Sequence, residues 1–124
     1  MVFDIVHCSA CGFAFVNPTP SFQFIMDFYS HAGHGEDSLP SAEAVLKQEN
    51  EDPNTTVDAS RIVQNLKAMT SGKNFLDVGC GYGLFSLEAR RHGFQVDAIE
   101  IADAERVIAK QMLGFTPTRI EHLQ

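Results

Sequence analysis

The chain has 124 residues, a formal net charge of −7 and 44% hydrophobic residues, which is enough for one domain with a buried core. It has no apolar run long enough to span a membrane, and its first basic residue is Lys47, so neither a transmembrane span nor a secretory signal is expected. The residues before Lys47 include five acids, whereas the remainder is nearly balanced in charge. Without a basic stripe to bind phosphates, neither nucleic acid nor a membrane is an expected partner.

The chain contains three cysteines, Cys8, Cys11 and Cys80. An odd number that includes a Cys-x-x-Cys pair argues against a disulfide framework and predicts a reducing, cytoplasmic compartment. Cys8 and Cys11 have the spacing of a metal knuckle, but zinc requires four ligands. His31 and His34 are further candidates, and the competing interpretation, a leftover knuckle with free thiols, is favoured.

The first segment, residues 1–30, alternates apolar and small residues around the cysteine pair. Pro20 suits a first helical position, so a short helix is predicted over residues 21–29. Its phenylalanines are assigned to the hydrophobic core: Phe22, Phe24 and Phe28.

The second segment, residues 31–56, is rich in Gly, Ser, Pro and charge and is interpreted as a connector. It holds one predicted helix over residues 42–49, capped by Ser41. From about Val57 to the end, helical and strand patterns alternate as in an α/β fold. The predicted order is a helix capped by Asp58, a strand over 74–78, a glycine turn over 79–83, a helix over 84–92, a strand over 94–99, a helix over 102–113 and the start of a third strand over 116–120. Right-handed crossovers would arrange three parallel strands in the order 3-2-1.

The most informative stretch is residues 75–83, where a strand runs into a turn with three glycines, Gly79, Gly81 and Gly83. Glycines in such a turn let a ligand approach the backbone, and the turn aims a helix N-terminus at that ligand. Glu100 ends the next predicted strand, where a carboxylate can accept hydrogen bonds from both hydroxyls of a ribose. The pattern predicts a nucleotide-type cofactor site.

Two residues discriminate between cofactors. The dinucleotide fingerprint requires a glycine at position 84, but this chain has Leu84 there. Asp77 would repel a pyrophosphate, whereas it would attract an ammonium or sulfonium group. An NAD-binding or other nucleotide-binding oxidoreductase domain is therefore the alternative. Cys80 is interpreted as a small residue that the turn admits rather than as a nucleophile, and no catalytic residue is identified.

The stretch Leu76-Asp77-Val78-Gly79-Cys80-Gly81-Tyr82-Gly83 resembles motif I of class I S-adenosylmethionine-dependent methyltransferases, and Glu100 resembles the ribose-binding acid of that family. The resemblance implies a Rossmann-like fold that binds S-adenosyl-L-methionine. The leader His7-Cys8-Ser9-Ala10-Cys11-Gly12 is similar to that of a subgroup in which a small zinc-binding ribbon precedes this fold. The implied cofactor-binding residues are Asp77, Gly79, Cys80, Gly81, Gly83 and Glu100, and the implied metal ligands are Cys8 and Cys11.

The family's sheet has seven strands and its ribbon has more than one cysteine pair, so the chain is expected to be truncated at both ends. The expected organisation is a remnant leader and helix over 1–30, a connector over 31–56 and the N-terminal half of the cofactor-binding domain over 57–124. The implied function is methyl transfer to a small-molecule acceptor, by a methyltransferase or its cofactor-binding fragment. The third alternative is a non-catalytic fragment that acts only by association.

The predicted strand over residues 74–78 is apolar and would be left with an unpaired edge. Residues 13–16 could cover this edge from within the chain, or a second chain could pair with it. The second arrangement also covers apolar helix faces, so a homodimer is expected.

Overall fold

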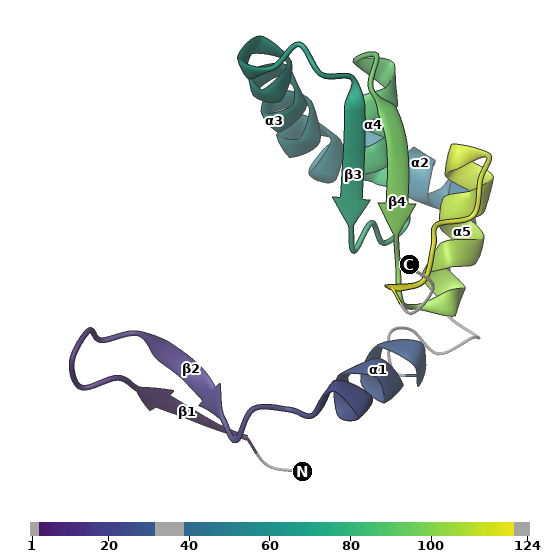
Figure 1. Cartoon of the computed structure of the whole chain (residues 1–124). Coiled ribbons are helices and arrows are strands. Elements are labelled where there is room, and N and C mark those ends of the chain that lie inside the picture. The colour runs from purple at the N-terminus through teal and green to yellow at the C-terminus, as the bar shows by residue number, and fades with distance from the viewer. Residues whose placement is uncertain (1–2, 32–38, 121–124) are drawn as a thin grey trace.

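The computed structural model describes residues 3–31 and 39–120, with side chains for residues 3–29 and 39–120 (Figure 1). It is a mixed α/β structure with one antiparallel and one parallel strand pair. Within the described residues no helix is both long and apolar enough to cross a membrane. The elements in chain order are β1 (Asp4–His7), β2 (Ala14–Asn17), α1 (Phe22–His31), α2 (Ala42–Glu51), α3 (Thr55–Met69), β3 (Asn74–Val78), α4 (Leu84–Arg91), β4 (Gln95–Ile99) and α5 (Asp103–Leu113).

The N-terminal segment forms a β-hairpin in which β1 pairs antiparallel with β2. Its turn carries the two cysteines and is closed by two backbone hydrogen bonds, from Cys8 N to Phe13 O and from Gly12 N to Cys8 O, each 2.8 Å long. Because β2 pairs with β1, and the hairpin stands apart from β3 and β4 in Figure 1, residues 13–16 do not cover the edge of β3, which was the alternative to the expected homodimer.

Helix α1 lies between the hairpin and the larger α/β part (Figure 1). The helix is found, but it begins later than predicted: Pro20 is not its first helical residue, and Ser21 caps it, since the Ser21 hydroxyl accepts a hydrogen bond from Phe24 N at 3.1 Å. The assignment of its phenylalanines to the core is wrong for Phe22 and Phe28, which are 65% and 51% exposed. A helix placed between two parts of the molecule has little apolar surface to pack against, and of its described side chains only Met26 is buried.

In the α/β part, β3 and β4 are parallel, with Asn74 opposite Gln95 and Val78 opposite Ile99. The predicted third parallel strand does not form within the described residues, where Thr118 makes one isolated bridge to Ile99. Two backbone hydrogen bonds form this bridge: Thr118 N donates to Ala98 O at 2.8 Å, and Glu100 N donates to Thr118 O at 3.0 Å.

The sequence around Thr118 explains why pairing stops there. On one side, the Pro117 carbonyl accepts a hydrogen bond from Arg106 Nε at 2.9 Å, which ties this segment to α5. On the other side, Ile120 already belongs to a helical turn. The prediction of three parallel strands in the order 3-2-1 is therefore corrected to two strands and a bridge.

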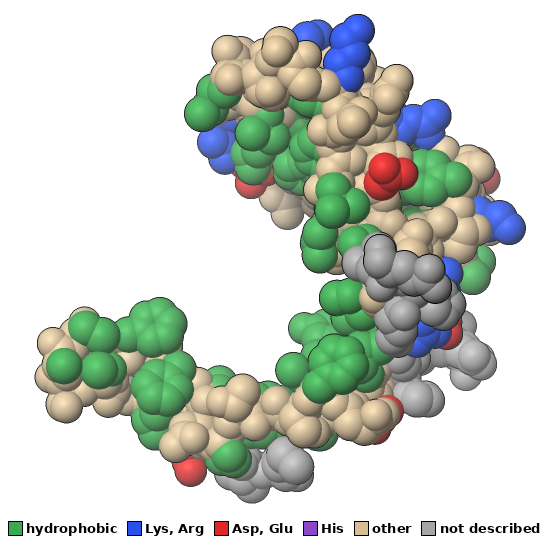
Figure 2. All heavy atoms as spheres, in the orientation of Figure 1, with side chains coloured by type: hydrophobic (Ala, Val, Ile, Leu, Met, Phe, Trp, Pro, Cys, Tyr) green, Lys and Arg blue, Asp and Glu red, His purple; other side chains and the backbone are tan. Residues whose placement is uncertain are grey.

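The hydrophobic core lies between the strands and the helices that pack on one face of them (Figure 1). Phe75 and Val96 point toward this face, and Phe75 stacks on Phe85 of α4 with ring centroids 5.9 Å apart. Strand residues alternate between faces, so Leu76 and Val78 point the other way and are 59% and 64% exposed. Figure 2 shows hydrophobic side chains exposed on this part of the molecule.

Helix α2 contributes to this core although it lies in the segment interpreted as a connector. Its predicted cap is confirmed, because the Ser41 hydroxyl accepts a hydrogen bond from Ala44 N at 3.1 Å. Val45 is buried with Leu84 of α4 and Ile108 of α5. The last turn of α2 also stabilises the start of α3, through the Glu49 carboxylate.

Helix α3 begins at Thr55, three residues before its predicted cap, Asp58, which lies in the first turn instead. The Glu49 carboxylate of α2 replaces a local cap by accepting hydrogen bonds from the backbone N–H groups of Asn54, Thr55 and Thr56, at 3.1 to 3.3 Å. Burial alone would raise the pKa of Glu49, but these hydrogen bonds outweigh it and hold the pKa below its usual range.

Candidate functional site

The predicted glycine turn joins β3 to α4 in a conformation that needs glycine. Gly79, Gly81 and Gly83 have φ angles of +77°, +53° and +86°, which side chains with a Cβ rarely adopt. A Cβ at Gly83 would also lie 3.0 Å from Leu113 Cδ1. The turn is attached to β4, because the N–H groups of Gly79 and Cys80 both donate to the carbonyl of Ile99, at 2.8 and 3.0 Å.

Glu100 lies at the end of β4 beside this turn, and its side chain is buried, with the residue 7% exposed. One carboxylate oxygen accepts a hydrogen bond from Gly81 N at 2.8 Å, and the other accepts from Ile101 N at 2.6 Å and Ala102 N at 2.9 Å. A carboxylate has about four acceptor positions, so these donors leave about one for a ligand. Glu100 therefore ties the turn to the start of α5, a role that its spacing from Asp77 does not indicate.

Asp77, in β3, is half-buried and held by α4. The hydroxyl of Ser86, a completely buried residue, donates a hydrogen bond to Asp77 Oδ2 at 2.6 Å. Ser86 was not among the predicted site residues. Nothing in the sequence distinguishes Ser86 from other polar residues of this helix, of which Glu88 is also buried.

Cys80 is buried among Ala98, Ala109 and Leu113. Burial, followed by the negative charges of Asp77 and Glu100, raises the pKa of Cys80 to about 12. Its thiol therefore stays protonated at neutral pH, and its role in the turn is to pack against α5.

Two cavities, of about 390 and 370 Å³, meet at the glycine turn, and Gly79 and Gly81 line both. Each falls in the size range of small-molecule sites, about 300–1,000 Å³. The first is lined by Glu100 together with Tyr29, Ile101, Glu105 and Ile120. The second is lined by Asp77 together with Thr55, Cys80, Tyr82, Leu84 and Phe85. The turn thus separates two adjoining compartments with different linings.

Both compartments are acidic. Glu100 and Glu105 line the first and Asp77 lines the second, whereas no Lys or Arg of the described chain lines either. The pKa of Tyr82 is raised, first by burial and then by the negative charge of Glu105. Such an environment attracts cationic groups and repels phosphates.

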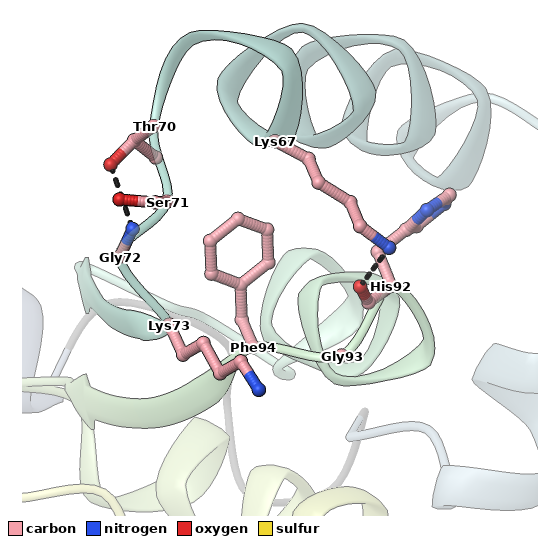
Figure 3. A pocket seen from close by; sticks show the side chains of 8 residues that line it. All are labelled: Lys67, Thr70, Ser71, Gly72, Lys73, His92, Gly93 and Phe94. Atoms are coloured by element: carbon pink, nitrogen blue, oxygen red, sulfur yellow. Dashed lines mark hydrogen bonds between the residues drawn. The ribbon is translucent and has the colours of Figure 1, made fainter.

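A third cavity, of about 440 Å³, lies at the opposite ends of β3 and β4 (Figure 3). Figure 3 shows the Phe94 ring inside it, with Lys67 and Lys73 on either side. Lys67 Nζ donates to the His92 carbonyl at 3.0 Å and so caps the C-terminus of α4. Although this cavity is larger, none of the predicted site residues lines it.

Cys8 and Cys11 lie together in the hairpin turn, far along the chain from the glycine turn. Hydrogen bonds from the backbone N–H groups of Cys11 and Ala10 lower the pKa of Cys8, which is the direction that favours a metal-binding thiolate. Among the described residues no group of three or more His, Cys, Asp or Glu side chains is placed to hold a metal ion. The side chain of His31 and the whole of His34 lie outside the described residues.

Sequence reasoning also missed Tyr29 and Glu105, which line the Glu100 compartment. Tyr29 reaches it from α1, and no periodicity or motif in the sequence connects that helix with the glycine turn. Glu105 lies on α5, where its position five residues after Glu100 could have suggested a second acid at the same edge.

A family model described as a methyltransferase domain matches residues 43–123 of the chain. A comparison with curated proteins finds no match. The matched residues comprise more than half of the chain and include all but the first residue of α2, the glycine turn, β4 and Glu100. The chain therefore belongs to the methyltransferase-domain family.

Proposed function

We propose that the chain binds S-adenosyl-L-methionine at the glycine turn, for methyl transfer to a small-molecule acceptor. The observation that carries the proposal is the meeting of two acidic compartments at Gly79 and Gly81, one with Glu100 and the other with Asp77. When bound, this cofactor supplies an electrophilic methyl group on a positively charged sulfur. The residues present fit a ligand that has a ribose, an ammonium and a sulfonium group.

Different residues of the chain would bind different parts of the cofactor. Three backbone N–H groups already fix the position of the Glu100 carboxylate. Its remaining acceptor position would accept a hydrogen bond from a ribose hydroxyl. Asp77, oriented by Ser86, would pair with the ammonium group. The glycines leave room for the ligand beside the backbone. This chain's contribution to methyl transfer would then be to bind and orient.

An NAD-binding oxidoreductase domain is disfavoured by the charge of the site. A dinucleotide would bring its pyrophosphate to a turn flanked by Asp77 and Glu100, with no Lys or Arg among the described lining residues to offset the repulsion. Leu84 also stands where the dinucleotide fingerprint has its third glycine.

We also propose that Cys8 and Cys11 are half of a tetrahedral zinc site that a second copy of the chain would complete. Two such turns would supply four thiolates, and the lowered pKa of Cys8 favours its deprotonation on metal binding. This proposal makes zinc content dependent on the association of two hairpin turns.

The test of cofactor binding is calorimetric titration with S-adenosylhomocysteine, the demethylated product, and with NAD. We expect the first to bind and NAD not to bind. Removing a charged acceptor costs about 1.5–3 kcal/mol per hydrogen bond, so Glu100→Ala should weaken binding by about 10- to 100-fold. Asp97→Asn, which alters an exposed acid in the same strand, is the matched control and should bind as the wild type does.

Because Glu100 also holds the turn, thermal unfolding of each variant must show that it is folded at the titration temperature. Equal affinity of the wild type and a folded Glu100→Ala variant would contradict the assigned role of Glu100. Binding of NAD in preference to S-adenosylhomocysteine would contradict the proposed cofactor.

A further inference from the structure

We propose that Tyr29 of α1 contacts the adenosine part of the bound cofactor, so that the N-terminal helix supplies a specificity-determining residue to a site whose sequence motifs all lie after residue 74. This inference rests on the proposed cofactor and adds to it a residue from outside the matched methyltransferase domain, residues 43–123.

The first support is the position of the side chain. Tyr29 lines the Glu100 compartment together with Ile101 and Ile120. These residues come from α1, from the segment between β4 and α5, and from the segment after the Thr118 bridge, so tertiary folding alone brings them to one cavity. Tyr29 is 51% exposed and thus has ring surface available for a ligand.

The second support is that the ring has a defined neighbour. Phe28 packs against Tyr29 with ring centroids 5.4 Å apart and an interplanar angle of 89°, an edge-to-face contact. An aromatic ring restrained in this way loses little conformational entropy when a ligand packs against it.

The third support is the difference between the two compartments. The Glu100 compartment combines an aromatic ring and three isoleucines with an acid suited to a ribose, which are the surfaces that a flat, weakly polar base requires. The Asp77 compartment also has aromatic residues in its lining, Tyr82 and Phe85, but its carboxylate suits an ammonium group, and Thr55 near the start of α3 adds a hydroxyl, so the amino-acid part is assigned there. Adenosine is therefore assigned to the side that Tyr29 lines.

The test compares the affinity of S-adenosylhomocysteine for the wild type and for Tyr29→Ala, Tyr29→Phe and Phe22→Ala, measured by calorimetry. Contact between a base and an aromatic side chain predicts about 5- to 150-fold weaker binding by Tyr29→Ala. Tyr29→Phe keeps the ring and should stay within about twofold of the wild type. Phe22 is an exposed aromatic residue of the same helix that does not line the cavity, so Phe22→Ala should bind normally.

Ligand fragments distinguish contact with adenosine from a purely structural role of Tyr29. Tyr29→Ala should weaken the binding of adenosine alone and leave the binding of L-methionine alone unchanged. Equal loss for both fragments, or equal loss with Phe22→Ala, would show that Tyr29 only positions α1 and would overturn the inference.

The chain has two tyrosines and no tryptophan, so in the Tyr82→Phe variant all tyrosine fluorescence comes from Tyr29. Adenosine should then change the tyrosine emission, after correction for its absorbance with free tyrosine amide. Unchanged emission at saturating adenosine would overturn the contact.

The two proposals fail differently. If the wild type does not bind S-adenosylhomocysteine, both are wrong. If it binds and Glu100→Ala weakens binding while Tyr29→Ala does not, only the role of Tyr29 is wrong.

Discussion

Cys8 and Cys80 are both free thiols, but their surroundings shift their pKa values in opposite directions. Backbone N–H groups of Cys11 and Ala10 stabilise the thiolate of Cys8 and lower its pKa. Burial, together with the charges of Asp77 and Glu100, raises the pKa of Cys80 to about 12. The same residue type therefore has two chemistries in this chain, and only that of Cys8 suits reaction or metal binding.

This contrast predicts selective alkylation of the folded protein. Thiolate, not thiol, reacts with iodoacetamide, so at roughly pH 7.5 Cys8 should be alkylated more than about ten times faster than Cys80. Because the pKa of Cys8 is lowered, its rate should level off at a lower pH than that of an ordinary cysteine, whereas Cys80 should stay slow across roughly pH 6–10. Mass spectrometry of digested samples measures both rates.

Unfolding the protein in urea is the control, since it removes both environments and should bring the two rates together. Rapid alkylation of Cys80 in the folded protein would contradict the assigned burial of its thiol.

Helix α4 is bounded by two glycines with similar backbone conformations and different surroundings. Gly83 precedes the helix with a φ of +86°, and Gly93 follows it with a φ of +91°. A Cβ at Gly93 would meet no atom within 4 Å, whereas a Cβ at Gly83 would lie 3.0 and 3.1 Å from Cδ1 and Cγ of Leu113. An alanine at Gly93 would therefore introduce backbone strain alone, whereas an alanine at Gly83 would introduce backbone strain and a steric clash with Leu113.

Alanine at either position should destabilise the protein, because a left-handed residue with a Cβ costs about 1–2 kcal/mol. Gly83→Ala should cost about 1–3 kcal/mol more than Gly93→Ala, since Leu113 is buried and cannot move away freely. Urea unfolding followed by circular dichroism measures both losses, with Gly93→Ala as the matched control. Equal losses would show that Leu113 accommodates the added methyl group.

At the scale of the whole molecule, the parallel strand pair exposes apolar side chains on one face. Leu76 and Val78 are 59% and 64% exposed on one face, and within the described residues β3 pairs with β4 alone. An apolar strand with an unpaired edge tends to associate. We propose that two chains meet through β3, with a symmetric interface.

Light scattering at about 100 µM protein should then give twice the chain mass of 13.7 kDa. A charge on this face disfavours association, so Leu76→Lys should be monomeric. Val107→Lys is the matched control, because Val107 is also 59% exposed but lies on α5, and this variant should remain a dimer. A monomer mass for the wild type, or an equal effect of both substitutions, would reject the interface.

The sequence by itself determined those elements whose signals are local. The strand over residues 74–78 has its predicted bounds, the turn that follows it needs its glycines, and α5 ends at Gly114 with a φ of +77°. Side-chain alternation, helix caps and positive φ angles act within a few residues, so they can be read from neighbouring residues. They were sufficient to find the glycine turn and the acid at Glu100.

Only the tertiary structure decided the features that depend on contacts between distant segments. The start of α3 depends on Glu49 of α2, Asp77 is oriented by Ser86, and the third predicted strand stops at Thr118. Tyr29 lines the Glu100 compartment from a helix with no motif in common with it. Hydrogen bonds and cavities of this kind form between whichever groups the fold brings within about 3–4 Å, and spacing along the chain does not encode that proximity.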